Sequence, residues 1–432
     1  MKILIKNIDV LASYDSEVMR CMDIGIEDSR IAFISKSGVP LPEGFAPDRT
    51  LPGAGRLAVP GLVNAHSHTA MTLLRGYADD LSLETWLFEK IFPAEAMLTG
   101  DDIYWGTTLG IAEMVRGGVT CVNDMYLKMD SVASAFADSG VRASVSIGPL
   151  LTEKRGDALV DAGGCNDFVR RWNGASDGRL RVNIEIHSVY LYQPETLREG
   201  AALAKSLDAA IHIHILETAT ERANMLGQYG ESSAELALKY GLFDVPSIAA
   251  HCVHTDDRDI AIFKEKNVNV VHNPSSNLKL ASGIAPITKM SERGVNVCLG
   301  TDGASSNNNL DMFMEMRLAA LIHKGTSGDP LAVPAPAAFK MATINGAKAL
   351  GFMDTGEISA GKKADIAIIS LDSPHLQPVY NHLSAIVYAA RASDVETVIV
   401  DGQILLDGRR LTTIDEEKAI YNARRISKKF GT

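Results

Sequence analysis

The chain has 432 residues, of which 46% are hydrophobic and 22% charged, and its formal net charge is −11. This length and composition suit one large folded domain with a smaller appended unit and argue against a disordered chain. The charges are spread without a Lys/Arg cluster that could follow a phosphate backbone, so no nucleic acid partner is expected.

The chain also lacks signals for a membrane or for disulfides. Its first apolar run, within residues 1–7, is too short for a signal peptide, and no stretch reaches the roughly 20 apolar residues of a membrane span. The cysteines are odd in number and show no C-x-x-C spacing, which indicates neither disulfides nor a thiolate metal site. We therefore expect a cytoplasmic protein with no membrane partner. The sequence leaves open whether it forms a homo-oligomer.

Both ends of the chain show the pattern of β-hairpins. Apolar and polar residues alternate, or β-branched runs are broken by Gly and Asp, in residues 2–11, 22–36, 364–371 and 397–406. These segments flank a middle of different character. The simplest arrangement is a small β-sandwich domain assembled from residues 1–56 and 361–432, with a second domain formed by residues 57–360.

In that middle part, apolar strand candidates alternate with helical stretches. We predict eight strands, at residues 58–65, 119–123, 141–147, 181–186, 210–216, 248–250, 268–271 and 295–300. This number of alternating units, with strands rich in Val and Ile, favours an α/β fold with a (β/α)8 TIM-type barrel over a doubly wound sheet.

Polar residues follow most of these strands. Because the carboxyl ends of all strands of a TIM barrel converge on one mouth, such residues can meet there although they are far apart in the sequence. The candidates are His66, His68, His187, His214, Glu217, His251, His272 and Asp302.

Two pairs of histidines have the spacing of metal ligands. His66 and His68 lie on the same side of an extended segment and could reach one ion, although such a pair also occurs as two structural histidines at a strand end. His212 and His214 likewise share one side of the fifth strand. Periodicity alone does not choose the ligand between them.

Longer stretches around these histidines are more specific. Residues 60–68, Pro-Gly-Leu-Val-Asn-Ala-His-Ser-His, together with residues 69–80, closely resemble the amidohydrolase superfamily, specifically its 5′-methylthioadenosine/S-adenosylhomocysteine deaminases. The resemblance recurs in the order of the family over nearly the whole barrel, at residues 213–218, 249–254, 272–280 and 300–305.

The resemblance implies that His66, His68, His214 and Asp302 bind one divalent metal ion. Three neutral imidazoles and a carboxylate suit Zn²⁺, with water or hydroxide in the open position, and Fe²⁺ or Mn²⁺ is not excluded by these ligand types. The His-x-x-Glu motif favours His214 as the ligand. His212 would then fill a polar position inside the barrel.

The resemblance further implies hydrolytic deamination of adenosine, 5′-methylthioadenosine or S-adenosylhomocysteine to the inosine analogue and ammonia. A metal-activated hydroxide would attack the ring. Glu217 would protonate the ring nitrogen and the departing amine, Asp302 would take a proton from the attacking water, and His251 would donate a hydrogen bond to the attacking oxygen. Glu217 as a surface carboxylate at a helix start and His251 as a core histidine are the structural alternatives.

Three further residues are candidates for substrate binding. Glu95 matches the carboxylate that accepts hydrogen bonds from the ribose hydroxyls in this family, and Trp86 is a candidate apolar wall beside the purine. Residues 181–188 contain no lysine that could bridge two metals, which favours one ion and leaves His187 free to contact the substrate. His254 is expected to be structural, and His272 to be a second-shell or barrel histidine.

The chain departs from the family within residues 150–177. A Gly-Gly-Arg that supplies a cation for the carboxylate of S-adenosylhomocysteine is replaced by Gly-Gly-Cys at residues 163–165. Arg155, Arg170 and Arg171 are candidates to substitute for it.

Two other functions compete with the nucleoside deaminase. One is an aminohydrolase of the same fold acting on a free purine, a pterin or an s-triazine, and the other is a catalytically inactive barrel acting as an interaction protein. Glu217 together with Glu95 favours a nucleoside, and the complete ligand set argues against an inactive barrel.

Overall fold

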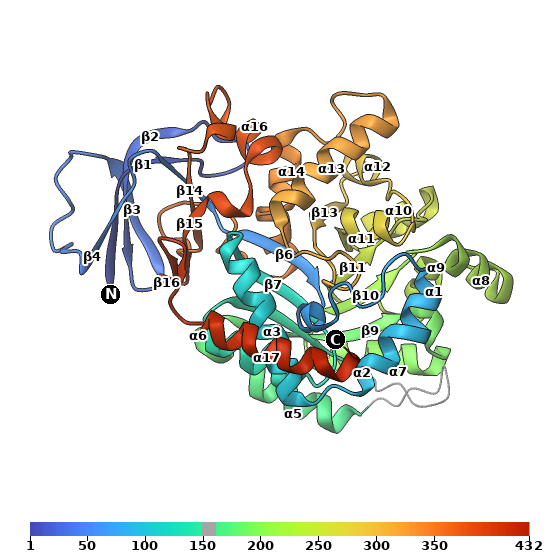
Figure 1. Ribbon diagram of the computed structural model, residues 1–432. Coiled ribbons are helices and arrows are strands. Elements are labelled where there is room, and N and C mark those ends of the chain that lie inside the picture. The colour runs from blue at the N-terminus through green and yellow to red at the C-terminus, as the bar shows by residue number, and fades with distance from the viewer. Residues whose placement is uncertain (149–160, 432) are drawn as a thin grey trace.

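The computed structural model describes residues 1–148 and 161–431 and contains two sheets. The larger part is an α/β barrel of eight parallel strands in sequential order, as predicted (Figure 1). Its strands are β6 (Leu62–Ser67), β7 (Val119–Met125), β8 (Arg142–Ile147), β9 (Leu180–Ser188), β10 (Ile211–Ile215), β11 (Ser247–His251), β12 (Asn269–His272) and β13 (Asn296–Leu299).

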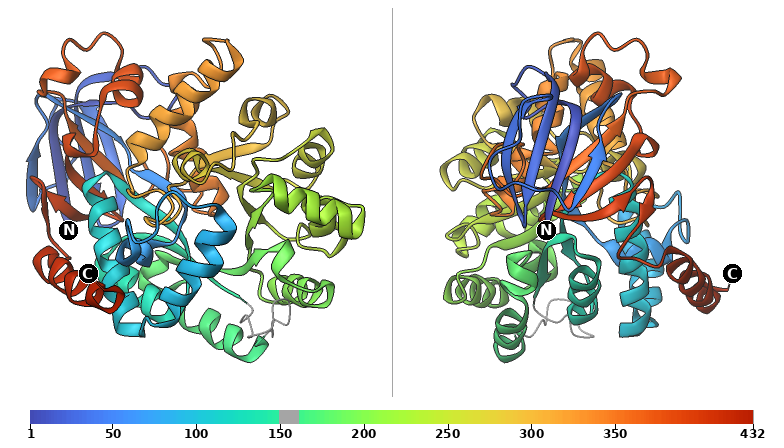
Figure 2. Two further views of the ribbon diagram at one scale, coloured as in Figure 1. Left: turned by 45° about the vertical axis from the view of Figure 1, so that its right-hand side comes forward. Right: turned by 90° about the vertical axis from the view of Figure 1, so that its left-hand side faces the viewer.

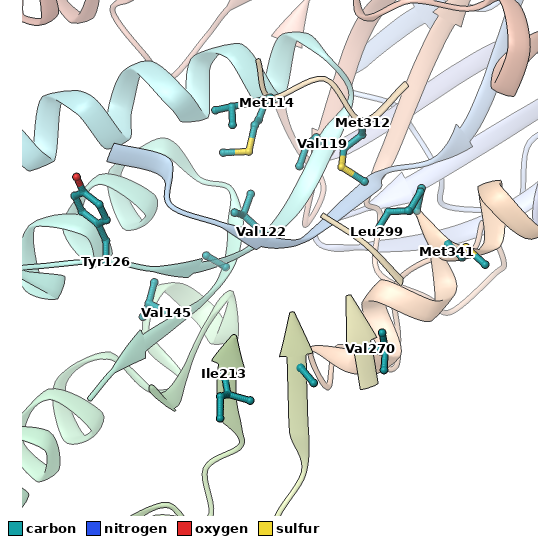
Figure 3. Close-up of a cluster of buried hydrophobic side chains, with 14 of the residues drawn as sticks. Met114, Val119, Val122, Tyr126, Val145, Ile213, Val270, Leu299, Met312 and Met341 are labelled. Atoms are coloured by element: carbon teal, nitrogen blue, oxygen red, sulfur yellow. The ribbon is translucent and has the colours of Figure 1, made fainter. Parts of the chain in front are cut away.

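Helices surround this barrel (Figure 2). Apolar side chains on the outer side of the strands pack against them, and Figure 3 shows Val122, Val145 and Ile213 from three different strands within this layer. The helices that follow the strands are α3 (Gly100–Arg116), α4 (Met129–Ser139), α5 (Ala162–Trp172), α6 (Ala175–Gly178), α7 (Pro194–Ser206), α8 (Ala219–Tyr229), α9 (Ser233–Lys239), α10 (Asp257–Glu265), α11 (Pro274–Lys279), α12 (Ile287–Glu292), α13 (Met312–Ser327), α14 (Ala335–Met341) and α15 (Ile344–Ala349).

The first and last barrel strands meet through side-chain and loop contacts. The Asn64 amide donates to Thr301 Oγ1 at 2.7 Å, and the Thr301 backbone N–H donates to Asn64 Oδ1 at 3.0 Å. The Asp302 N–H donates to the carbonyl of His66 at 3.0 Å. A Cβ at Gly300 would lie 2.8 Å from the backbone nitrogen of His66, so only glycine permits this approach. The seam therefore brings Asp302 to His66 on β6 and to His68, which follows this strand.

The second sheet is built from both ends of the chain. Its path runs β17-β16-β15-β14-β5-β1-β2-β3, with β4 paired to β1, so β5 joins the N-terminal and C-terminal halves. Isoleucines of both halves form a separate core beneath it. The strands are β1 (Lys2–Val10), β2 (Met19–Glu27), β3 (Arg30–Lys36), β4 (Arg49–Pro52), β5 (Arg56–Pro60), β14 (Ile366–Ser370), β15 (Val395–Val400), β16 (Gln403–Asp407) and β17 (Arg410–Leu411).

One predicted strand is wrong. The run over residues 58–65 is two strands, because β5 belongs to the terminal sheet and β6 begins the barrel. Gly61 separates them, and a Cβ there would lie 2.1 Å from Thr120 Oγ1. The division of the chain into residues 1–56 with 361–432 and residues 57–360 remains a proposal.

The two parts make extensive contact. Arg142 on β8 is 2% exposed and pairs with Asp365, at 2.7 Å from Nε to Oδ2. The C-terminal helix α17 (Glu416–Ser427) lies along α3, where Arg425 pairs with Asp101 at 3.2 Å (Figure 1). Within the described ranges, none of the helices combines the length and the apolar character needed to cross a membrane.

Candidate active site

A cavity of about 630 Å³ opens at the carboxyl ends of the barrel strands. Residues at strand ends form one part of its lining, the metal wall, and residues 83–96 and 126–131 form much of the rest, the substrate wall. The predicted site residues that line this cavity are His68, Trp86, Glu95, His187, His214, Glu217, His251 and Asp302.

The predicted metal ligands converge at the inner end of this cavity. One ligand atom each of His66, His68 and His214 lie within 4.8 Å of one another. His68 Nε2 is 3.1 Å from His214 Nε2 and 3.2 Å from Asp302 Oδ1, and His66 Nε2 is 3.4 Å from the same oxygen. His66 Nε2 is buried without a hydrogen-bond partner among the described residues. Such a set of nitrogen and oxygen donors fits a divalent ion.

In two of these histidines, the ring nitrogen that points away from the cluster contacts a backbone carbonyl. His68 Nδ1 lies 2.5 Å from the carbonyl oxygen of Met125, and His214 Nδ1 lies 2.7 Å from that of His187. Because a carbonyl oxygen only accepts, each Nδ1 carries the proton and each Nε2 keeps its lone pair for a metal. His212 does not join this cluster; its Nε2 lies 2.8 Å from His66 Nδ1.

Asp302 is oriented by two serines. Its Oδ2 accepts hydrogen bonds from Ser276 at 2.6 Å and from Ser306 at 2.8 Å, so Oδ1 is the oxygen that faces His66 and His68. The backbone of Asp302 is left-handed, with φ of 61°. This conformation is uncommon for a residue other than glycine and is typical of functional sites held by their surroundings.

Glu217 lies beside the same cluster and is 7% exposed. Leu216, just before it, is left-handed with φ of 54°, and the backbone N–H groups of Leu216 and Glu217 donate to the carboxylate of Glu221 at 2.8 and 2.9 Å. Burial raises the pKa of Glu217 to about 7. A carboxyl group that titrates near neutral pH is suited to give and take protons.

His251 lies next to Glu217 in the lining of the cavity. Its Nδ1 lies 2.8 Å from Asn277 Oδ1 and 3.9 Å from Glu217 Oε1. A ring nitrogen of His251 is also within 4.8 Å of ligand atoms of His66 and Asp302. His251 is therefore part of the site and not only a packed core residue.

Two candidate substrate residues come from short helical elements over the cavity. Trp86 begins the π-helical turn η2 (Trp86–Ile91), which follows α1 (Leu83–Thr85), and Glu95 lies on α2 (Phe92–Ala96). Both are 5% exposed, and the Trp86 indole N–H has no hydrogen-bond partner within the described part of the chain. Burial raises the pKa of Glu95 to about 7, while the neighbouring Tyr126 hydroxyl opposes that rise.

His187 completes the set from the end of β9. Burial lowers the pKa of His187 to about 3, so its ring is neutral at physiological pH. Its Nδ1 is buried and has no hydrogen-bond partner in residues 1–148 and 161–431. A neutral ring with an unpaired nitrogen can bind a polar group of a ligand.

The remaining sequence candidates lie elsewhere. His272 does not line the cavity and lies 3.3 Å from His323, nitrogen to nitrogen, whereas His254 Nε2 donates to the carbonyl of Ser282 at 2.8 Å. Both positions agree with structural roles.

The candidates for the missing family arginine give no clear replacement. Cys165 is buried on α5 and does not line the cavity, although Phe168 of the same helix does. Arg170 and Arg171 are exposed and pair with Asp167 at 3.1 Å and with Asp130 at 2.7 Å. Arg155 lies outside the described residues.

The sequence reasoning missed several residues of the site. Glu185 lines the cavity, and its place two residues before His187 on one strand was the available signal. Asp124 accepts the N–H of Thr69 at 2.7 Å and so holds the turn that follows His68. Nothing in the local sequence of Asp124 indicates this contact, because its partner is 55 residues away.

An eight-stranded barrel with three histidines and an aspartate at its mouth defines a metal-dependent hydrolase. Comparison with known proteins gives the family. Residues 57–405 match the model described as the amidohydrolase family. The chain is 50% identical over 431 residues to a 5-methylthioadenosine/S-adenosylhomocysteine deaminase of Acetivibrio thermocellus, covering 99% of each chain. It is 45% identical over 432 residues to that of Desulforudis audaxviator, covering 100% of this chain and 99% of the relative.

Solved structures agree with this assignment. A zinc-bound adenosine deaminase from Xanthomonas campestris superimposes with a TM-score of 0.92 at 35% identity, over 99% of this chain and 98% of that one. A guanine deaminase from C. acetobutylicum has a TM-score of 0.83 at 23% identity, over 94% and 100%, and shares the fold. The chain belongs to the amidohydrolase family and, within it, to the 5-methylthioadenosine/S-adenosylhomocysteine deaminases.

Proposed function

We propose that this enzyme deaminates an adenine nucleoside, namely adenosine, 5′-methylthioadenosine or S-adenosylhomocysteine, to the inosine analogue and ammonia. The observation that carries the proposal is the meeting of a metal ligand set, an acid of raised pKa and the buried Glu95 around one cavity. A volume of about 630 Å³ suits a ligand of nucleoside size. The names of the full-length relatives support the same reaction.

The proposed metal centre consists of His66, His68, His214 and Asp302 and holds one divalent ion. Zn²⁺ is the first choice for this ion, and Fe²⁺ and Mn²⁺ are the alternatives. The zinc in the Xanthomonas structure supports this choice. When bound, the ion provides a nucleophile at neutral pH because it lowers the pKa of a coordinated water. Strand β9 carries no lysine that could bridge a second ion, which supports a single site.

The protein's own groups then have separate proton-transfer and hydrogen-bonding roles. Asp302, oriented by Ser276 and Ser306, takes a proton from the attacking water. His251, held by Asn277, donates a hydrogen bond to the attacking oxygen as negative charge develops there. Glu217 delivers its proton to the ring nitrogen, which its pKa of about 7 allows at neutral pH. The two protons that the attacking water loses, the first by way of Asp302, then supply the departing amine through Glu217 and restore the acid form of Glu217.

Residues of both walls bind the substrate. Glu95 accepts hydrogen bonds from the ribose hydroxyls, and such donors stabilise its charged form against the effect of burial. Trp86 packs beside the purine, and the neutral ring of His187 offers its unpaired nitrogen to the substrate. A riboside uses Glu95, whereas a free purine, pterin or s-triazine leaves this buried carboxylate without the ribose donors.

The cytoplasm is the proposed location of the enzyme. All five cysteines are unpaired in the structure, which supports a reducing compartment.

A substrate panel tests the proposed function. Ammonia release is measured with adenosine, 5′-methylthioadenosine, S-adenosylhomocysteine, guanine, a pterin and an s-triazine, under equal enzyme and zinc. We expect one or more of the adenine nucleosides to have the highest kcat/KM. A higher kcat/KM for a free base or triazine would reject the nucleoside assignment, and no turnover of any compound by zinc-loaded enzyme would favour the inactive barrel.

A further inference from the structure

Behind the metal site, three buried side chains form a row of hydrogen-bonding groups. Ser146 Oγ on β8 lies 2.9 Å from His212 Nδ1, and His212 Nε2 lies 2.8 Å from His66 Nδ1. Ser146, His212 and His66 each have 0% exposure. The row ends at His66 Nε2, the nitrogen that faces Asp302 and has no hydrogen-bond partner in the described ranges.

The protons along this row follow from the chemistry of neutral imidazole, in which one nitrogen donates and the other accepts. A metal at His66 needs the lone pair of Nε2, so Nδ1 carries the proton and donates it to His212 Nε2. His212 must then carry its own proton on Nδ1, where Ser146 Oγ accepts it. One arrangement of protons therefore satisfies both short contacts and leaves Nε2 free.

His66 differs in this respect from the other two histidines of the centre. The partners of His68 and His214 are backbone carbonyl oxygens, which can only accept. The partner of His66 is a second imidazole, which can present either a lone pair or an N–H. If His212 carried its proton on Nε2, His66 would have to accept at Nδ1 and would carry its own proton on the nitrogen that faces the ion.

His212 is not itself placed to bind the ion. Its Nε2 is taken by His66 Nδ1, and its Nδ1 faces Ser146 on the side away from the cavity. The groups of potential ligands found within residues 1–148 and 161–431 contain His214 and not His212. The Asn123 amide nitrogen lies 3.3 Å from both ring nitrogens of His212 and also donates to the carbonyl of Ala65, so it lies beside the row.

We propose that His212 is a positioning residue of the metal centre: held by Ser146, it fixes the tautomer and orientation of His66 that leave Nε2 free for the ion. The inference rests on the proposed metal site. Replacing such an outer partner of a metal-binding histidine typically weakens metal binding by about 10- to 100-fold.

The test measures zinc affinity without catalysis. Zinc-loaded full-length protein is titrated with a chelator of known affinity, and the zinc dissociation constant is compared between the wild type and two variants. His212→Leu removes the acceptor at a similar volume, and we expect zinc binding about 10- to 100-fold weaker. His212→Gln places an amide oxygen within reach of His66 Nδ1, and we expect it to recover most of that loss.

A matched control is His323→Leu. His323 is also a buried histidine that contacts another histidine, His272, but it does not line the cavity. We expect its zinc affinity to stay within about twofold of the wild type, since it has no place among the outer partners of the ligands. Ser146→Ala is the milder variant for the case in which His212→Leu does not fold, and we expect it to weaken zinc binding by a few-fold.

The outcomes separate this inference from the proposed function. A wild type that binds no zinc tightly would reject the metal centre itself. Tight zinc binding by the wild type together with equal affinity in folded His212→Leu, or in Ser146→Ala if His212→Leu does not fold, would reject only the role of His212. Equal losses in His212→Gln and His212→Leu would assign the effect to packing and likewise overturn the inference.

Discussion

The two walls of the cavity are built in different ways. On the metal wall, side chains at strand ends are held by other protein groups: His68 and His214 by backbone carbonyls, and Asp302 by two serines. The other wall draws on helices of three to six residues, and there the Trp86 N–H has no partner within the described residues.

This difference indicates where a bound ligand supplies the hydrogen-bond partners that the protein lacks. Buried polar groups are nearly always hydrogen-bonded, so an unpaired donor in a cavity wall marks a place where a ligand or water belongs. On the metal wall, the ligands need an ion, and the unpaired Nδ1 of His187 needs a polar group of the substrate. The opposite wall needs a substrate, which is consistent with one barrel chemistry serving different substrates in related enzymes.

The largest expected effect comes from removing the ion from the metal wall. We expect one divalent ion per chain and a loss of activity of at least ~10³-fold on chelation, because a metal contributes several kcal/mol to the transition state. Metal analysis of active protein and activity after chelation and zinc addition measure this. Two equivalents of metal per chain, or full activity in the chelated protein, would contradict the single-ion centre.

A smaller effect is expected where the metal wall transfers protons. Glu217→Gln keeps the size of the side chain and its hydrogen bonding but removes the transferable proton, so kcat should fall by at least ~10²-fold with zinc still bound. Steady-state kinetics and metal content are measured on the same sample. Unchanged kcat would assign proton transfer to another group.

The third prediction moves to the substrate wall. Glu95→Ala should lower kcat/KM for ribosides by about tenfold or more, since a hydrogen bond to a charged group is worth roughly 1.5–3 kcal/mol, while free bases are little affected. Paired kinetics on adenosine and adenine compare the two, with Glu84→Ala as an exposed control on α1 that does not line the cavity. An equal loss for riboside and base would mean that Glu95 is structural.

The smallest effect concerns the 5′ end of the nucleoside. Adenosine or 5′-methylthioadenosine should have a kcat/KM about tenfold above that of S-adenosylhomocysteine, because burying the carboxylate of the latter without a paired cation is costly. Kinetics with the three nucleosides under identical conditions provide the comparison. A preference for S-adenosylhomocysteine would show that another cation replaces the family arginine, and Lys128, exposed at the cavity rim, is the first to mutate.

Much of this architecture was predictable because it depends on local pattern. The eight barrel strands are apolar runs bounded by polar residues, and the candidates at their ends fall on one mouth once the fold is known. The false strand at residues 58–65 shows the limit. Residues on both sides of Gly61 are equally apolar, and the collision with Thr120 that makes this glycine necessary exists only in the folded barrel.

Contacts across the barrel were beyond the reach of the sequence. His212 and His66 are 146 residues apart, so the strand period places both inside the barrel but does not pair them. The positions of the short helical elements that carry Trp86 and Glu95 were likewise not predictable from the sequence. Their place over the cavity depends on packing against the barrel and not on any local signal.

The sheet formed by both ends of the chain has a consequence for the order in which a ribosome can complete the molecule. Val59 on β5 pairs with Ala367 on β14, so the final partner of this strand is 308 residues away. At about 5–20 residues per second, β5 waits roughly 15 to 60 s for it. During that time its edge is an open template for pairing with another chain. Strand β5 is therefore the N-terminal strand of the nascent protein that most needs protection, because it gains its last neighbour in the sheet only when β14 has been made.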